Sequence, residues 1–179
     1  MDTDNILYSG MFIFLIGFAW IFGCIIRMVY PKKVSVFTAP GFSGAVTLPK
    51  AGDYAVTITL PLKSGIASYL PGASFYSAQF TITASESQQA IALQRKGKWG
   101  ANSYNKDFIG NKSHIIGVFN CPQATENYDI VCTNPQIIHD TYKVEIINYI
   151  SLGKRMMQTI PGWILVFIAV GLIIIPQVS

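Results

Sequence analysis

The fold is decided by one stretch, MFIFLIGFAWIFGCIIRMVY, which runs from Met11 to Tyr30. Up to Ile26 this stretch contains no charged residue. A helix rises about 1.5 Å per residue, so about 20 apolar residues cross the roughly 30 Å hydrocarbon layer of a bilayer. Arg27 stands near the end of the run, where its long side chain can reach the headgroups. The stretch therefore predicts a transmembrane helix over residues 11–30.

A second apolar run extends from Ile160 to Val178. It predicts a second transmembrane helix over residues 156–179, with Lys154 and Arg155 just before it. The organisation is then a short polar tail (1–10), the first helix, a β-rich domain (31–155) and the second helix. Both termini are expected on one side of the membrane and the domain on the other.

A cleaved signal peptide is the competing interpretation of the first run. Such a peptide begins with basic residues and ends at a small-residue cleavage site. This chain begins with Asp2 and Asp4, and its apolar run is long. We therefore expect the first helix to be retained.

The composition agrees with a membrane protein. Hydrophobic residues make up 51% of the chain and charged residues 12%, whereas a soluble domain is about 25% charged. The net charge of +4 is spread over the sequence rather than gathered in a basic run. Nucleic-acid binding is therefore not expected, and the lipid bilayer is the expected partner of the two helices.

Small residues on both predicted helices would allow two helices to approach closely, within one chain or between two copies. They are Gly17, Ala19, Gly23, Gly162, Ala169 and Gly171. A homo-oligomer formed through the transmembrane helices is one consequence that this pattern leaves open.

The region between the helices has the patterns of β structure. Tyr54, Val56, Ile58 and Leu60 alternate with small or polar residues, which predicts a half-buried strand. Further strands are expected at residues 80–83, 91–93, 115–119 and 142–146, with Gly, Pro and Asn turn signals between them. Many short strands with regular turns favour a mainly β domain, of β-sandwich or jelly-roll type.

The segments Phe37-Thr-Ala-Pro-Gly41, Val46-Thr-Leu48 and Ala51-Gly-Asp-Tyr-Ala-Val56 open this region. With an anchor on each side, they resemble bacterial two-helix membrane proteins of unknown function, whose β-sandwich opens with a similar "F…PG…L…aG-Y-v" pattern. The resemblance implies a sandwich on the outer face of the inner membrane and brings no catalytic residues. The layout is also similar to that of small bacterial immunity proteins against secreted toxins.

Two arguments about the side of the membrane conflict. Lys32, Lys33, Lys154 and Arg155 flank the helices on the domain side, which by the positive-inside rule indicates the cytoplasm. The domain, however, is rich in Ser, Thr, Asn and Gln and poor in charge, as exported domains are. Because long loops obey the charge rule less strictly, we expect the domain on the extracytoplasmic, periplasmic side.

The cysteines bear on the same question. Cys121 and Cys132 could close a disulfide, and disulfides persist in oxidising compartments. Closing a loop of this length would add about 3 kcal/mol. Cys24 lies in the first predicted helix and is expected to serve packing.

Signals for catalysis or metal binding are weak. His114 and His139 are the only histidines, and neither has partners at the short spacing of a zinc site. We expect them to be ordinary surface or loop residues. The sequence has no nucleophile elbow, phosphate loop or paired carboxylate motif. We therefore expect no catalytic residue, no metal and no cofactor.

One polar stretch, residues 94–106, is rich in basic and aromatic side chains, which are favoured at protein interfaces. The candidate residues for partner binding are Arg95, Lys96, Lys98, Trp99 and Tyr104. The alternatives are a solvated hairpin or a contact with lipid headgroups. The sequence thus favours a non-enzymatic, membrane-anchored interaction module, possible partners being a toxin, for an immunity protein, or a membrane-complex subunit. An accessory, structural subunit of an inner-membrane complex is the alternative.

Overall fold

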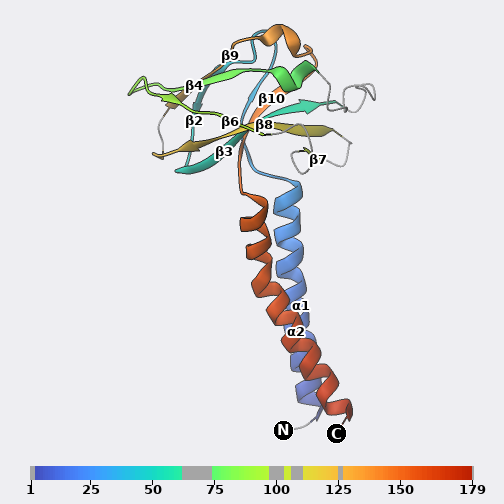
Figure 1. Cartoon of the computed structure of the whole chain (residues 1–179). Coiled ribbons are helices and arrows are strands. Elements are labelled where there is room, and N and C mark those ends of the chain that lie inside the picture. The colour runs from blue at the N-terminus through green and yellow to red at the C-terminus, as the bar shows by residue number, and fades with distance from the viewer. Residues whose placement is uncertain (1–2, 62–73, 97–102, 106–110, 125–126, 179) are drawn as a thin grey trace. The chain divides into compact units, whose positions relative to one another are not determined.

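A computed structural model of the chain describes residues 3–61, 74–96, 103–105, 111–124 and 127–178. The chain divides into a helix unit (Met1–Met28 with Ile150–Ser179) and a β unit (Val29–Tyr149). Two terminal apolar helices thus flank a β-rich region (Figure 1). Each unit is described by itself below.

The helices are α1 (Thr3–Val29) and α2 (Leu152–Val178). By length and composition, Asn5–Arg27 and Gly153–Ile174 are both sufficient to cross a membrane. Both helices begin earlier than the sequence suggested. Residues 3–10, expected as a polar tail, are helical, because Ile6, Leu7 and Tyr8 continue the apolar pattern. The Ser9 hydroxyl donates to the carbonyl of Asn5 inside the helix.

The start of α2 has an identifiable cap. The backbone N–H of Lys154 donates to the Ser151 hydroxyl at 3.4 Å, and that of Arg155 donates to the Ser151 carbonyl at 2.9 Å. A serine in this position satisfies N–H groups that have no partner within the first helical turn. The cap explains why α2 begins at Leu152 rather than at residue 156.

The two helices pack through small residues. A Cβ placed on Gly17 would lie 2.9 Å from the carbonyl oxygen of Gly162, and one on Gly162 would lie 3.0 Å from the carbonyl oxygen of Gly17. Gly10 meets Ile173 and Ala169 in the same way, and Ala169 is fully buried. The backbones therefore approach so closely that neither glycine could carry a side chain without a shift.

The other small residues predicted for packing lie elsewhere. Ala19 is exposed, and a Cβ on Gly23 or Gly171 would meet nothing within 4 Å. Beside the seam, the indole N–H of Trp20 donates to the Gln158 carbonyl at 3.0 Å. Trp20 is therefore a helix-contact residue.

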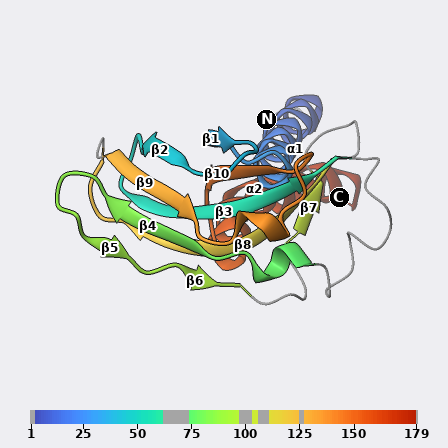
Figure 2. The ribbon, with the colours of Figure 1, turned by 90° about the horizontal axis from the view of Figure 1, so that it is seen from above.

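The β unit consists of two antiparallel sheets (Figures 1 and 2). Its strands are β1 (Lys33–Phe37), β2 (Gly44–Thr47), β3 (Gly52–Leu60), β4 (Phe80–Ala84), β5 (Ala90–Ile91), β6 (Gln94–Arg95), β7 (Ser103–Asn105), β8 (Lys112–Cys121), β9 (Asn127–Cys132) and β10 (Lys143–Asn148). The six-stranded sheet has the order β1-β10-β3-β8-β6, with β7 also paired to β8, and the four-stranded sheet has the order β2-β9-β4-β5. In Figure 2, β1 and β2 lie along one margin of the unit, and β5 and β6 lie along the opposite margin.

The hydrophobic core lies between the sheets. Alternate residues of β3 (Tyr54, Val56, Ile58 and Leu60) share one cluster with residues of β4, β8, β9 and β10. This is the face that the alternating pattern predicted. Since inward-facing apolar residues come from both sheets, the unit has the architecture of a sandwich.

The opposite face of β3 differs from the prediction of a half-buried strand. Ala55, Thr57 and Thr59 are as deeply buried as the core residues between them. Ala55 belongs to a second, smaller cluster with residues of β8 and β10, against which Tyr149 packs. The six-stranded sheet is therefore buried on both faces along β3, and small or hydroxyl side chains suit such a covered face.

Candidate functional site

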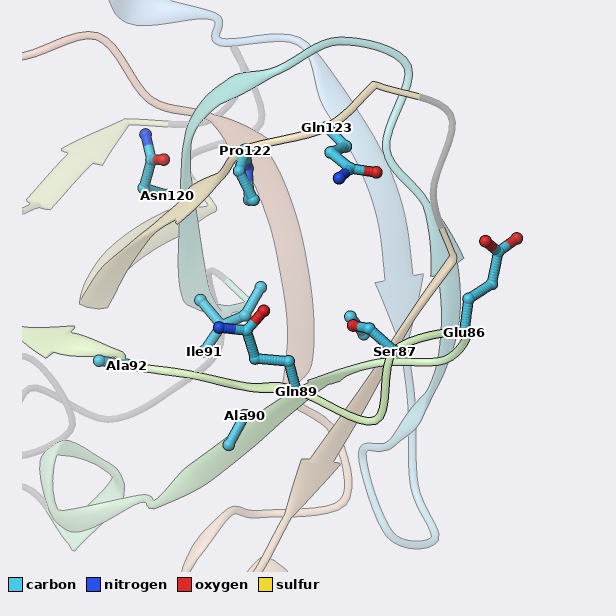
Figure 3. A pocket seen from close by; sticks show the side chains of 10 residues that line it. Glu86, Ser87, Gln89, Ala90, Ile91, Ala92, Asn120, Pro122 and Gln123 are labelled. Atoms are coloured by element: carbon cyan, nitrogen blue, oxygen red, sulfur yellow. The ribbon is translucent and has the colours of Figure 1, made fainter.

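A cleft opens at the margin of the β unit, and we call it the edge cleft (Figure 3). Its volume is about 400 Å³. Its described lining consists of Ala84, Glu86, Ser87, Gln89, Ala90, Ile91, Ala92, Asn120, Pro122 and Gln123. Figure 3 shows side chains of the 86–92 stretch on one side and those of residues 120–123 on the other. The cleft thus lies between β5, the last strand of the four-stranded sheet in the described part, and the segment that ends β8.

The hairpin that forms one wall is held in place by hydrogen bonds. The Ser85 hydroxyl donates to Asp129 Oδ2 at 3.0 Å, and the Ser85 N–H donates to the Asn127 carbonyl. Gln88, at a φ of +52°, takes the left-handed conformation that a tight turn requires. Its side-chain amide donates to the Ser85 carbonyl at 2.8 Å. The wall is therefore preformed rather than dependent on a ligand.

The cleft can form hydrogen bonds of both kinds. Its polar groups are chiefly side-chain amides and a hydroxyl, which can both donate and accept hydrogen bonds, as a peptide backbone does. Ile91 supplies an apolar contact, and Glu86 is the one charged residue of the described lining. Such a lining suits a neutral or basic extended segment better than an acidic one.

The predicted partner-binding residues are placed differently. Arg95 donates from Nη2 to the carbonyls of Tyr76 and Ala78, at 3.0 and 2.7 Å. Lys96 Nζ lies 5.7 Å from the centre of the Tyr149 ring. Arg95 thus ties β6 to the 3-10 helix η2 (Ser74–Ser77). Tyr104 is on β7, and Lys98 and Trp99 lie outside the described residues.

His114 corrects the expectation of a surface or loop histidine. It is on β8, 2% exposed, and its ring packs against Phe75 and Tyr76. Nδ1 lies 2.7 Å from the Tyr76 hydroxyl, whereas Nε2 is buried and has no hydrogen-bond partner among the described residues. Burial, aided by the charge of Lys112, lowers the pKa of the His114 imidazole to about 4. At neutral pH this histidine is therefore uncharged.

The same aromatic cluster reaches the other histidine. Phe75 meets the edge of Tyr142, and the Tyr142 ring lies 5.5 Å from that of His139. His139 is exposed, and its Nδ1 lies 2.9 Å from the Thr141 hydroxyl. Within the described ranges, no three His, Cys, Asp or Glu side chains lie close enough to hold a metal ion. Both histidines thus pack against rings of this aromatic cluster.

The predicted disulfide is not formed in this structure. Cys121 and Cys132 are buried free thiols at the ends of β8 and β9, which belong to different sheets. The Cys121 thiol lies 2.8 Å from the Gln123 carbonyl and 3.2 Å from the Tyr128 hydroxyl. Burial raises the pKa of the Cys132 thiol, which makes it less reactive. Cys24, also free, contacts the Gln158 carbonyl on α2.

Sequence reasoning missed the edge cleft. Its lining residues carry no charge pattern, and their order along the chain does not reveal that residues 86–92 and 120–123 meet. The signal that was available is the run Glu86-Ser-Gln-Gln-Ala90, a polar turn between two apolar positions. The chain matches no protein-family model and no curated protein, so the resemblance inferred from its sequence stays an expectation.

Proposed function

We propose that the chain is a two-pass membrane protein whose β unit is a non-enzymatic interaction module. Insertion is supported by the surface of the two helices. Large apolar side chains such as Phe12, Phe18 and Phe167 are mostly exposed, although each helix is long enough to span a bilayer. Exposing this much apolar surface to water is costly, whereas lipid covers it without cost.

The edge cleft is the observation that carries the interaction function. Its wall is preformed, its lining matches a peptide backbone, and it borders β5, the last strand of its sheet in the described part. Proteins often capture an extended segment by adding it to such an edge. We therefore propose that the cleft binds an extended, neutral or basic segment of a partner protein.

We propose the extracytoplasmic side for the β unit, on the basis of its polar, charge-poor composition. The free thiols remove the disulfide from this argument. On that side the partner would be an incoming toxin, for which the chain is an immunity protein, or another subunit at the outer face of the inner membrane.

Site-specific photo-crosslinking in the native membrane tests the proposal. A photo-reactive residue at Gln89 or at Gln123 should give the same adduct, because the two positions face one cleft from opposite walls. Thr47, exposed on the edge strand β2, is the matched control and should give none.

An Ile91→Lys change should abolish both adducts, because it replaces the apolar contact with a positive charge that a neutral or basic segment does not match. Equal crosslinking from Thr47, or no adduct from either cleft position, would contradict the proposed binding function.

An accessory subunit that packs through its helices is the second candidate. A groove of about 450 Å³ runs along α1 over Ile16, Ala19, Trp20, Gly23, Cys24 and Arg27. The groove borders the Gly17–Gly162 seam, since Trp20 and Cys24 also contact the Gln158 carbonyl on α2, and a helix of another subunit would fit its open side. Under this alternative, Gly23→Leu should release the chain from its complex while the crosslinks at Gln89 and Gln123 are unchanged or absent.

A further inference from the structure

A second cavity of the β unit lies beside the six-stranded sheet, and we call it the carboxylate cavity. Its volume is about 280 Å³. Lys33, Thr59, Asn111, Thr141, Lys143 and Glu145 supply the polar side chains of its described lining. These residues come from β1, β3, β10 and the segments next to them. The cavity is separate from the edge cleft, which shares none of these residues.

Glu145 is the unusual member of this lining, since it is 1% exposed. Its Oε2 accepts a hydrogen bond from the Thr59 hydroxyl at 3.1 Å, and its Oε1 lies 3.7 Å from Lys33 Nζ. Thr59 is linked in turn to the Ser113 hydroxyl at 2.8 Å. The carboxylate is thus held in a fixed position by a buried hydroxyl network.

Burying an apolar residue at position 145 would cost less free energy than burying a carboxylate there. Ile147, two residues along β10, lies on the same face in an apolar cluster with Ala55, Ile115 and Val118. Burying a carboxylate among such neighbours costs free energy even when it is paired. A charge kept at this cost, beside a cavity, is a reason to look for a ligand there.

The charges around the cavity alternate in sign. Lys143 precedes Glu145 by two residues on the same face of β10, and Lys33 stands on the neighbouring strand β1. A simple anion would be repelled by the carboxylate, and a simple cation would be repelled by two ammonium groups. A ligand that carries both signs can place its cation beside Glu145 and its anion beside the two lysines.

We infer that the carboxylate cavity binds a phosphoethanolamine group, with its primary ammonium at Glu145 and its phosphate at Lys33 and Lys143. The same group occurs free and as the headgroup of phosphatidylethanolamine. Lys33 follows the end of α1 at Val29 by four residues, which is at most about 14 Å of chain. If α1 spans a membrane as proposed, a lipid headgroup is therefore within reach of Lys33.

Binding to the full-length chain in phosphatidylcholine nanodiscs tests the inference. Isothermal titration with O-phosphoethanolamine should give saturable binding. Phosphocholine, whose quaternary ammonium has no N–H to donate, should bind at least tenfold more weakly. Ethanolamine and inorganic phosphate, which each lack one of the two charges, should also bind at least tenfold more weakly.

Variants locate the site. Lys143→Gln changes an exposed lining residue and should weaken binding at least tenfold without affecting folding. Glu145→Gln should do the same, with its thermal transition in ligand-free nanodiscs as the check on its folding. Lys50→Gln, exposed and outside the lining, is the control and should leave binding unchanged.

Lipid composition distinguishes the two sources of the group. Replacing part of the phosphatidylcholine by phosphatidylethanolamine should raise the unfolding temperature of the wild type but not of Lys143→Gln, which would identify the headgroup as a ligand. Binding of the free compound without this rise would identify a soluble ligand. The inference is overturned if phosphocholine binds as tightly as phosphoethanolamine, if neither variant weakens binding, or if neither form binds.

Discussion

The outer faces of the two sheets differ in their exposure to solvent. On the four-stranded sheet, Thr81 and Val131 stand opposite each other and are exposed, as the solvated side of a sandwich should be. On the six-stranded sheet, central residues of the corresponding face are buried, among them Ile147 and Glu145 of β10. The outer face of one sheet is thus open to solvent, whereas central residues of the other outer face are buried. Covered and open positions of the same residue type should therefore differ in their tolerance of mutation.

The largest difference is expected between Ile147 and Val131. Ile147→Asn puts a polar amide into the apolar cluster of the covered face and should cost about 4 kcal/mol of unfolding free energy. Val131→Asn, at a position 45% exposed, should cost less than about 1 kcal/mol. Urea unfolding of the full chain in micelles, followed by far-UV circular dichroism, measures both. Equal costs would mean that the outer face of the six-stranded sheet is not covered in solution.

The two histidines give the next comparison. Because the pKa of buried His114 is lowered to about 4 from 6.5, the unfolded chain binds the extra proton first as the pH falls. The stability due to neutral His114 is therefore complete above pH 6.5, and about 3 kcal/mol of it is lost as the pH falls to about 4. Denaturant unfolding at several pH values should show this loss in the wild type.

The variants separate this effect from other titrations. His114→Phe should remove the loss between pH 6.5 and 4, while His139→Phe, at the exposed position, should keep it. A wild-type slope that survives in His114→Phe would assign the pH dependence to other groups.

A smaller effect is expected in the helix pair. Gly17→Leu places a side chain against the Gly162 backbone and should destabilise the pair by about 2 kcal/mol. Gly23→Leu, on a face where a Cβ meets nothing within 4 Å, should leave the pair intact. Titration with SDS, read through Trp20 fluorescence because its indole bonds to Gln158, measures the difference. The assigned seam is wrong if the two variants behave alike.

The adjacent residues Arg95 and Lys96 differ in how many contacts hold their side chains. Arg95→Gln loses two hydrogen bonds to backbone carbonyls and should cost about 1 kcal/mol, given the exposure of the side chain. Lys96→Gln loses one contact with the Tyr149 ring and should cost about half as much. Thermal unfolding in micelles compares the two, and a larger loss for Lys96 would reverse the assignment.

The smallest expected effect is none at all. Because the three thiols are free, adding dithiothreitol should not change the unfolding temperature of protein taken from its native membrane. A disulfide closing this loop would instead lose about 3 kcal/mol on reduction. A clear drop in unfolding temperature would therefore restore the predicted bridge.

Local patterns explain what could be predicted from the sequence. The two apolar runs and the alternation of residues 54–60 are properties of neighbouring residues, and both helices and β3 follow them. β1 and β9 escaped because they mix charged, polar and apolar residues, and their pairing with distant strands stabilises them. The burial of Thr57 and Thr59 was missed for a similar reason, since the burial of both faces of a strand leaves no local period in the sequence.

The candidate sites depend on such long-range meetings even more. Gln89 and Gln123 share the edge cleft, and Lys33 and Glu145 share the carboxylate cavity, although more than thirty and more than a hundred residues separate them. No spacing rule joins residues so far apart. Conversely, Arg95 was predicted to bind a partner because it lies in a basic and aromatic stretch of sequence. Its guanidinium instead donates hydrogen bonds to two backbone carbonyls of the same unit.

The seam between the helices has a consequence for their register. Gly10 and Gly17 are seven residues apart, and so are Gly162 and Ala169 on the other helix. A helix with 3.6 residues per turn returns to within about 20° of the same face after seven residues, so both positions of each helix lie on one contact line. One residue inserted between Gly10 and Gly17 would rotate one half of the line by about 100° relative to the other. The register of the pair is therefore fixed where small residues of one helix meet the backbone and side chains of the other.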